Sequence, residues 1–268
     1  MHRRQIAYLV ALGLLSASHA AAQRHRDDDC NRRQSRRQFV VCDERDTGWR
    51  GSGAVNVDAG PNGGISVVGW DRDSVDVLIT VKARAETEDA ARELIAEVRV
   101  VASGGTLRAT GPASRRNASW WVTYDLSVPR RTDLTLETVN GPVSVEDVRG
   151  VMRLETSNGP ITLANVGGDV RARLDNGPLT VSLAGTEWAG EGLDASTTNG
   201  PIVLRVPEGY NAELETGTVN GPMSFSFPIT VQGRFGGGNQ RIRTTLGRGG
   251  RPIRVVTTNG PAVINRSR

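Results

Sequence analysis

The sequence contains few of the residues on which enzyme active sites most often depend. Only three of its 268 residues are histidine, and two of these fall within the first 22 residues. The third, His25, lies in a highly charged segment, so Ser-His-Asp, Cys-His and histidine-metal sites have no support. The glycine-rich stretches at residues 51–53 and 236–238 lack the strand–loop–helix context of a phosphate-binding loop. We therefore predict no catalytic residue, no metal site and no cofactor.

Cysteine and long hydrophobic runs are also scarce. Cys30 and Cys42 are the two cysteines, and if the chain is exported, as the N-terminal segment described next indicates, an isolated pair predicts a disulfide that closes a short N-terminal loop. The apolar stretch at residues 6–15 is too short to span a membrane as a helix. It follows Arg3 and Arg4 and precedes small residues at 20–22, which predicts a signal peptide over residues 1–22; a buried N-terminal helix is the alternative.

Cleavage of the predicted signal peptide would leave residues 23–268 as the mature chain. Removing residues 1–22 takes away Arg3 and Arg4 and lowers the formal net charge from +4 to +2, so no global electrostatic signature remains. Residues 23–52 are highly charged and are expected to be flexible apart from the Cys30–Cys42 disulfide. We expect a periplasmic, secreted or cell-surface protein with no membrane span, whose folded domain covers residues 53–268.

Charge is distributed unevenly along this domain. No Asp or Glu occurs after Glu215, whereas eight arginines follow it: Arg234, Arg241, Arg243, Arg248, Arg251, Arg254, Arg266 and Arg268. A basic end of this kind suits an envelope polysaccharide, another anionic surface or a protein partner. A solvated arginine-rich surface is the simpler interpretation. Nucleic acid is not favoured, because no aromatic residues alternate with the arginines.

Residues 53–133 predict short strands and one helix. Val, Ile and Thr alternate with polar residues at 53–58, 63–70, 74–83, 106–110 and 119–129, which is typical of half-buried strands. A helix is expected over residues 88–98, with Thr87 as its N-cap. Ala90, Leu94, Ile95 and Val98 share one face of that helix.

Residues 134–268 are repetitive. "LETVNGPVSV" begins at residue 136 and "LETSNGPITL" begins 18 residues later, at residue 154. The tripeptide Asn-Gly-Pro recurs at Asn140, Asn158, Asn176, Asn199, Asn220 and Asn259. The intervals are 18, 18, 23, 21 and 39 residues, and the last suggests two units with a degenerate turn near Asn239. Apolar residues follow each tripeptide at alternate positions, so every unit has one apolar face that stacking would bury.

The proline after each Asn-Gly pair argues against a tight hairpin. In a two-residue hairpin the residue after Asn-Gly donates its backbone N–H to close the turn, and proline has no N–H to donate. We therefore expect each strand to pair with the equivalent strand of the next unit, which predicts a single-stranded β-helix-like β-solenoid of 18–21-residue repeats. The asparagine side chains would then form a hydrogen-bonded ladder. A meander of hairpins with longer loops is the alternative.

The segment "YDLSVPRRTDLTLETVNGPVSVEDVRGVMRLETSNGPITL" carries a family resemblance. With Val128-Pro129, the iterated Leu-Glu-Thr…Asn-Gly units and the closing residues 244–264, the chain from Gly53 onward resembles a family of exported bacterial adhesin-like domains of unknown function. That family is related to the head domain of auto-transporter adhesins. The resemblance implies a β-solenoid-like fold in cell-envelope or secreted proteins, and it implies no catalytic residues.

Three interpretations of function remain open. The first is binding: the 23-residue interval contains a loop at 185–192 in which Trp188, between Glu187 and Glu191, could stack on a sugar. In the competing interpretation Trp188 folds back over the edge of the repeat. The second is a polysaccharide-acting enzyme on a β-helix scaffold that uses Glu137, Glu155 and Asp175 as paired acids, although the recurrence of acids near the turns argues against catalysis. The third is an accessory module of an envelope sensor. We expect a non-enzymatic binding or structural role.

Overall fold

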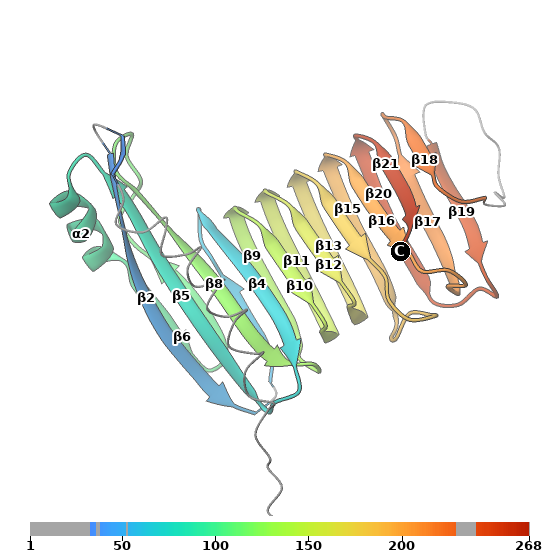
Figure 1. Ribbon diagram of the computed structural model, residues 1–268, viewed down its shortest axis with the longest axis horizontal. Helices are drawn as coiled ribbons and strands as arrows, with labels where there is room; N and C mark the ends of the chain where they lie inside the picture. Colours follow the sequence, from blue (N-terminus) through green and yellow to red (C-terminus); the bar gives the residue numbers. More distant parts are fainter. Residues whose placement is uncertain (1–32, 36–37, 52, 229–239, 268) are drawn as a thin grey trace, which may run out of the picture.

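The computed structural model describes residues 33–35, 38–51, 53–228 and 240–267 as two large β-sheets and one helix (Figure 1). Sheet A has 11 strands and sheet B has 10. In spatial order, sheet A consists of β1 (Arg33–Ser35), β2 (Gln38–Arg50), β5 (Ser74–Ala85), β8 (Ser119–Pro129), β4 (Gly63–Trp70), β10 (Val143–Glu146), β12 (Ile161–Ala164), β14 (Leu179–Ser182), β16 (Ile202–Val206), β21 (Ala262–Arg266) and β18 (Met223–Phe225). Sheet B consists of β19 (Gln240–Leu246), β17 (Ala212–Thr218), β20 (Pro252–Asn259), β15 (Gly192–Asn199), β13 (Gly167–Asn176), β11 (Arg149–Asn158), β9 (Leu134–Asn140), β3 (Val55–Asp58), β7 (Thr106–Thr110) and β6 (Arg99–Ser103).

The central repeat units pair as the proline argument predicts. Each unit contributes one strand to sheet B before its Asn-Gly-Pro turn and one strand to sheet A after it. In sheet A, β10 pairs in parallel with β12, with Val143 opposite Ile161. In sheet B, β11 pairs in parallel with β9 and β13, so that Asn158 lies between Asn140 and Asn176. The predicted pairing between equivalent strands is confirmed, and the hairpin meander is wrong for these units.

The predicted β-solenoid, however, is wrong. Both sheets are mixed: β2, β5 and β8 are antiparallel in sheet A, and β17 and β19 are antiparallel in sheet B. Strand order also departs from chain order, because β20 and β21, the last two strands of the chain, lie between β15 and β17 and between β16 and β18. The sequence repeat identifies a unit's turn and apolar face, but not the neighbours that the unit will have.

The 39-residue interval is not two parallel repeat units. After β18 the described chain resumes at β19, which runs antiparallel to β17, with Ala212 opposite Leu246. The degenerate turn expected near Asn239 lies outside the described residues. The interval therefore contains β19, which runs antiparallel to its neighbour β17 in sheet B. The spacing of the tripeptides did not predict this antiparallel strand.

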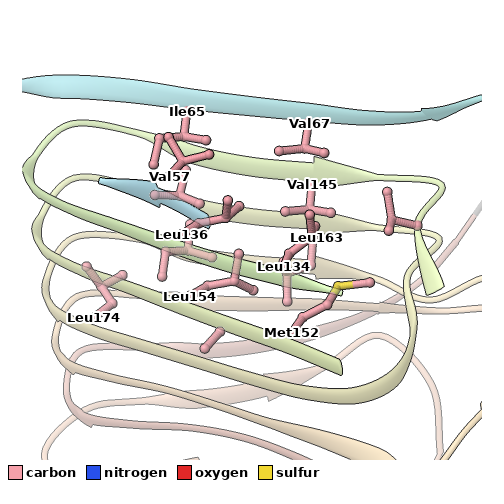
Figure 2. Packing of buried hydrophobic residues seen from close by; sticks show 14 of the residues in the cluster. Val57, Ile65, Val67, Leu134, Leu136, Val145, Met152, Leu154, Leu163 and Leu174 are labelled. Atoms are coloured by element: carbon pink, nitrogen blue, oxygen red, sulfur yellow. The ribbon is translucent and has the colours of Figure 1, made fainter. Parts of the chain in front are cut away.

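The core lies between the two sheets. Figure 2 shows Ile65, Val67, Val145 and Leu163 of sheet A facing Leu134, Leu136, Met152 and Leu154 of sheet B. These side chains are at most 2% exposed, and each comes from an alternate position of its strand. Burial of a side chain of this size contributes about 1.5–3 kcal/mol to folding, so a continuous apolar layer is the main source of stability. The layer extends from the helix end of the molecule to the C-terminal strands.

The N-terminal part of the domain is built from longer antiparallel strands. Residues 38–50, expected to belong to a flexible segment, instead form β2, which pairs with β5 from Phe39–Ala85 to Arg50–Ser74. Alternate residues of β5 are buried, and this apolar face stabilises the pairing. Residues 1–32, with the predicted signal peptide, lie outside the described part of the chain.

The predicted helix is confirmed as α2 (Glu88–Glu97). The Thr87 hydroxyl accepts a hydrogen bond from the Ala90 N–H at 3.1 Å, as an N-cap should. The buried face consists of Ala91, Ile95 and the C-cap Val98, whereas Ala90 is exposed, so the predicted face is displaced by one residue at its start. In the described chain, no helix is long and apolar enough to cross a membrane.

Candidate functional site

The asparagines of the Asn-Gly-Pro turns form a continuous side-chain ladder on the surface. Asn158 Nδ2 donates to Asn140 Oδ1 at 2.8 Å, and Asn176 Nδ2 donates to Asn158 Oδ1 at 3.1 Å. The ladder continues through Asn199, Asn259 and Asn220, with donor–acceptor distances of 2.8–2.9 Å. At its other end, Asn140 Nδ2 donates to Pro61 O and Asn62 Oδ1. The predicted ladder is confirmed, and Asn62 belongs to it as well.

Backbone hydrogen bonds of the turns also run between units. The Gly159 N–H donates to Asn176 O at 3.0 Å, and the N–H after the proline, that of Ile161, donates to Pro178 O at 3.1 Å. Proline therefore costs the turn no hydrogen bond, because its neighbours donate to the next unit. The glycine is required, since a Cβ on Gly159 would lie 2.2 Å from Gly141 O.

A buried threonine two residues before the asparagine supports most of these turns, a role that was not predicted from the sequence. Thr138 Oγ1 donates to Gly63 O at 2.8 Å, and Thr257 Oγ1 donates to Gly200 O at 2.9 Å. Thr156 and Thr197 make the equivalent bond. The third residue of the repeated Leu-Glu-Thr motif was the available signal, because a hydroxyl at a core position needs an acceptor.

Beside the ladder, the outer face of sheet B carries a shallow hollow of about 520 Å³. It is lined by four carboxylates and one guanidinium: Asp58, Glu137, Glu155, Asp175 and Arg173. Pro61 and the exposed side chain of Val139 add an apolar part. Parallel pairing creates the hollow's charge pattern, because Asp58, Glu137, Glu155 and Arg173 lie opposite one another on four successive strands.

The acids of this row are not equally neutralised. Arg108 lies opposite Asp58 and makes an ion pair with it at 3.1 Å. In the described part of the chain, no ion pair involves Glu137 or Glu155. Adjacent strands are about 4.8 Å apart, so the two glutamates are like charges on neighbouring strands, an arrangement that destabilises a sheet. The hollow is therefore a negatively charged surface, and the pairing of the strands fixes the positions of its acids.

The expected alignment of three acids is only partly correct. Glu137 and Glu155 are opposite each other, but the next position in that row is Arg173, and Asp175 lies two residues further along β13. Among the described residues, no group of three or more His, Cys, Asp or Glu side chains is placed to hold a metal ion. The acids are spread along the strands and do not converge on one point.

Trp188 is folded into the core. Its side chain is 5% exposed, and its indole N–H donates to Gly168 O at 2.9 Å. This is the competing interpretation of the sequence, in which the ring covers the edge of the repeat. Of the predicted contact residues, Glu187 and Glu191 are exposed, and Glu191 accepts from Arg251 at 3.2 Å. A ligand at this loop would contact the glutamates and not the indole face.

The arginines after Glu215 are largely paired with acids from earlier in the chain. Arg254 contacts Asp194 at 2.6 Å and Glu215 at 3.3 Å, and Arg243 also contacts Glu215. Arg266 pairs with Glu208 at 2.9 Å. Strand pairing, both parallel and antiparallel, therefore places acids beside several arginines of the basic end predicted from the linear sequence, in agreement with the simpler interpretation of a solvated surface.

Cys42 lies in β2, opposite Lys82. Its predicted partner Cys30 lies outside the described residues, and the Cys30–Cys42 disulfide therefore stays a prediction.

Comparison with known proteins gives distant structural similarities. No protein-family model matches the chain, and no curated protein matches it. A candidate cell adhesion protein of Clostridium sporogenes is 9% identical with a TM-score of 0.36, covering 84% of this chain and 100% of its own. A candidate adhesin of Bacteroides fragilis is 12% identical with a TM-score of 0.40, covering 84% and 97%. A candidate lipid binding protein of Parabacteroides distasonis is 9% identical with a TM-score of 0.25, covering 84% and 97%.

These similarities are too distant to transfer a property to this chain. They name adhesins among the proteins that resemble it, and they do not test the relation to the head domain of auto-transporter adhesins.

Proposed function

We propose that the chain is an exported, non-enzymatic envelope protein that binds a hydroxyl-rich polymer, such as an envelope polysaccharide, in the acidic hollow of sheet B. The observation that carries the proposal is the pair Glu137 and Glu155, which lie opposite each other on neighbouring strands and make no ion pair among the described residues. Like charges at this spacing reduce stability, and such a cost is commonly retained where a surface has a function. The adhesin-like resemblance of the sequence supports the same class of function.

The chemistry of the hollow suits sugar hydroxyls. Carboxylates accept hydrogen bonds from hydroxyl groups, and Arg173 supplies donors at one end of the row. Val139 and Pro61 give an apolar surface beside them for the C–H faces of a sugar ring. The hollow is shallow, which favours a modest affinity per site and a chain that extends along several strands.

Titration calorimetry with soluble envelope polysaccharides tests this proposal. Glu137→Gln and Glu155→Gln should each weaken binding about tenfold, the loss expected when a hydrogen bond to a charged group is removed. Glu146→Gln is the matched control, because Glu146 is exposed on the outer face of sheet A. Equal affinity of all three variants would refute binding in the hollow.

The same samples distinguish the enzymatic alternative. Release of reducing ends from the polysaccharide, lost in Glu137→Gln or Glu155→Gln, would show a polysaccharide-acting enzyme in place of a binding protein. A specific protein captured by the wild-type chain, with no glycan bound, would favour an accessory module of an envelope sensor.

A further inference from the structure

The ladder places a chemically labile dipeptide in every rung. Asn-Gly occurs seven times in the sequence, at Asn62 and at the six Asn-Gly-Pro turns. In this dipeptide the glycine nitrogen can attack the asparagine side chain, because glycine has no Cβ to hinder the approach. The chain therefore contains seven Asn-Gly dipeptides that are chemically capable of this reaction.

Interior rungs restrain both reacting groups. At Asn140, the Gly141 N–H donates to Asn158 O at 2.8 Å, and Asn140 Oδ1 accepts from Asn158 Nδ2 at 2.8 Å. Attack requires the glycine nitrogen to lose its proton and the side-chain amide to rotate toward it. Both hydrogen bonds must break before that can happen. The same pair of bonds restrains Asn158, Asn176, Asn199 and Asn259.

Within the described residues, Asn220 is the last rung of the ladder and lacks both restraints. Its Nδ2 donates to Asn259 Oδ1 at 2.8 Å, but in the described residues nothing donates to Asn220 Oδ1 and Gly221 N–H has no acceptor. The following strand, β18, is three residues long and lies at the edge of sheet A, where it pairs with β21 and with no other described strand. At the opposite end of the ladder lies Asn62, and the glycine that follows it, Gly63, belongs to β4. Because β4 pairs with β10 on one side and β8 on the other, that end of the ladder is not at the edge of its sheet.

We propose that Asn220 is the site at which this protein deamidates, and that the ladder protects the interior asparagines. The Gly221 nitrogen, having lost its proton to hydroxide, forms a bond to Cγ of Asn220. The Cγ–Nδ2 bond then breaks as the amide nitrogen takes a proton from water and leaves as ammonia, which regenerates the hydroxide. Water then opens the resulting succinimide at either carbonyl, giving aspartate or isoaspartate. No oxidant or reductant takes part.

The product weakens the end of the fold. A carboxylate at residue 220 cannot donate to Asn259 Oδ1, so the last hydrogen bond of the ladder is lost. Isoaspartate also lengthens the backbone by one methylene directly before β18. Because β18 pairs on one side only, this strand should detach first and leave the edge of β21 unpaired.

The chain contains its own matched control for this site. Residues 138–142 and residues 218–222 are the same pentapeptide, Thr-Val-Asn-Gly-Pro, one at an interior rung and the other at the end. The full chain is incubated at mildly alkaline pH, and aspartate and isoaspartate at both sites are followed by peptide mass mapping. We expect Asn220 to react at least about tenfold faster than Asn140. The reason is that two hydrogen bonds of ordinary strength restrain the reacting groups at Asn140, and neither has an equivalent among the described residues at Asn220. Equal rates, or faster reaction at Asn140, would overturn the proposal.

Two further measurements separate the ladder from local sequence. In urea-unfolded protein the two pentapeptides should react at the same rate. In Asn158→Ala, which removes the side-chain bond to Asn140 but leaves the backbone carbonyl, reaction at Asn140 should rise severalfold while reaction at Asn220 stays unchanged. A rate at Asn140 that does not respond, in a variant that remains folded, would show that the ladder gives no protection.

Discussion

Asn158 Nδ2 donates a hydrogen bond of 2.8 Å to Oδ1 of Asn140, which precedes it by 18 residues. The same side chain accepts from Asn176 Nδ2 at 3.1 Å, so one amide joins three units. The ladder therefore connects strands that the backbone has already paired, and it adds side-chain bonds to each turn.

Asn158→Ala should lower the free energy of unfolding by about 1–2 kcal/mol. The variant removes two side-chain hydrogen bonds, each contributing about 0.5–1.5 kcal/mol, and the exposed partners are partly compensated by water. Urea unfolding measures the change, with Asn265→Ala on β21 as the control outside the ladder. Equal stability of the two variants would mean that the ladder contributes no net stability.

Gly177→Ala should destabilise the fold by about 2 kcal/mol or more. Gly177 has a φ of +145°, and a Cβ there would lie 2.4 Å from Gly159 O, so both the backbone conformation and the contact between turns disfavour a side chain. Gly53→Ala is the matched control, because a Cβ on Gly53 would meet nothing within 4 Å. Thermal unfolding of the two variants should separate them clearly, and similar midpoints would contradict the predicted clash.

The sequence predicted the repeat's local geometry because that geometry depends on one chemical fact. Proline cannot donate the hydrogen bond that closes a hairpin, and the strands after Pro142 and Pro160 accordingly pair with each other. The solenoid prediction failed because alternation of apolar residues is the same in parallel and antiparallel strands. Residues 74–85 have that alternation and pair antiparallel with β2 and β8.

The candidate site was less predictable than the strands. Glu137 and Glu155 could be aligned from the 18-residue spacing, but the ion pair of Asp58 with Arg108 depends on the order β9–β3–β7, which no repeat specifies. The sequence left two interpretations of Trp188 open, an exposed ring in a loop and a ring folded over the edge of the repeat. In the structure the ring is buried, and its indole N–H donates to the carbonyl of Gly168, 20 residues earlier in the chain.

Trp188→Phe should reduce stability by about 1 kcal/mol or more, because it leaves Gly168 O without the indole donor. The folded variant should bind polysaccharide as the wild type does, since the ring is buried. Urea unfolding and calorimetry, performed on the same preparation, test the two statements together. Unchanged stability with lost binding would show that the indole contacts ligand and not the core.

Stability should fall as pH rises from 10 to 12, and Tyr210 should account for part of the loss. Tyr210 is 3% exposed, and burial, followed by the nearby charge of Glu187, raises its pKa from 10.0 to about 12. Between these values the unfolded chain loses the phenol proton while the folded chain keeps it. Ionisation therefore favours the unfolded state, and the free energy of unfolding decreases with pH.

The matched variant is Tyr210→Phe, which has no proton to lose. Burial also raises the pKa of Tyr124, so the variant should keep part of the pH dependence. Between pH 10 and 12 the wild type should lose roughly 2 kcal/mol more than Tyr210→Phe, from the size of the Tyr210 shift. Urea unfolding at a series of pH values gives the comparison. Parallel curves for the two proteins would mean that Tyr210 ionises in the folded state as it does in the unfolded chain.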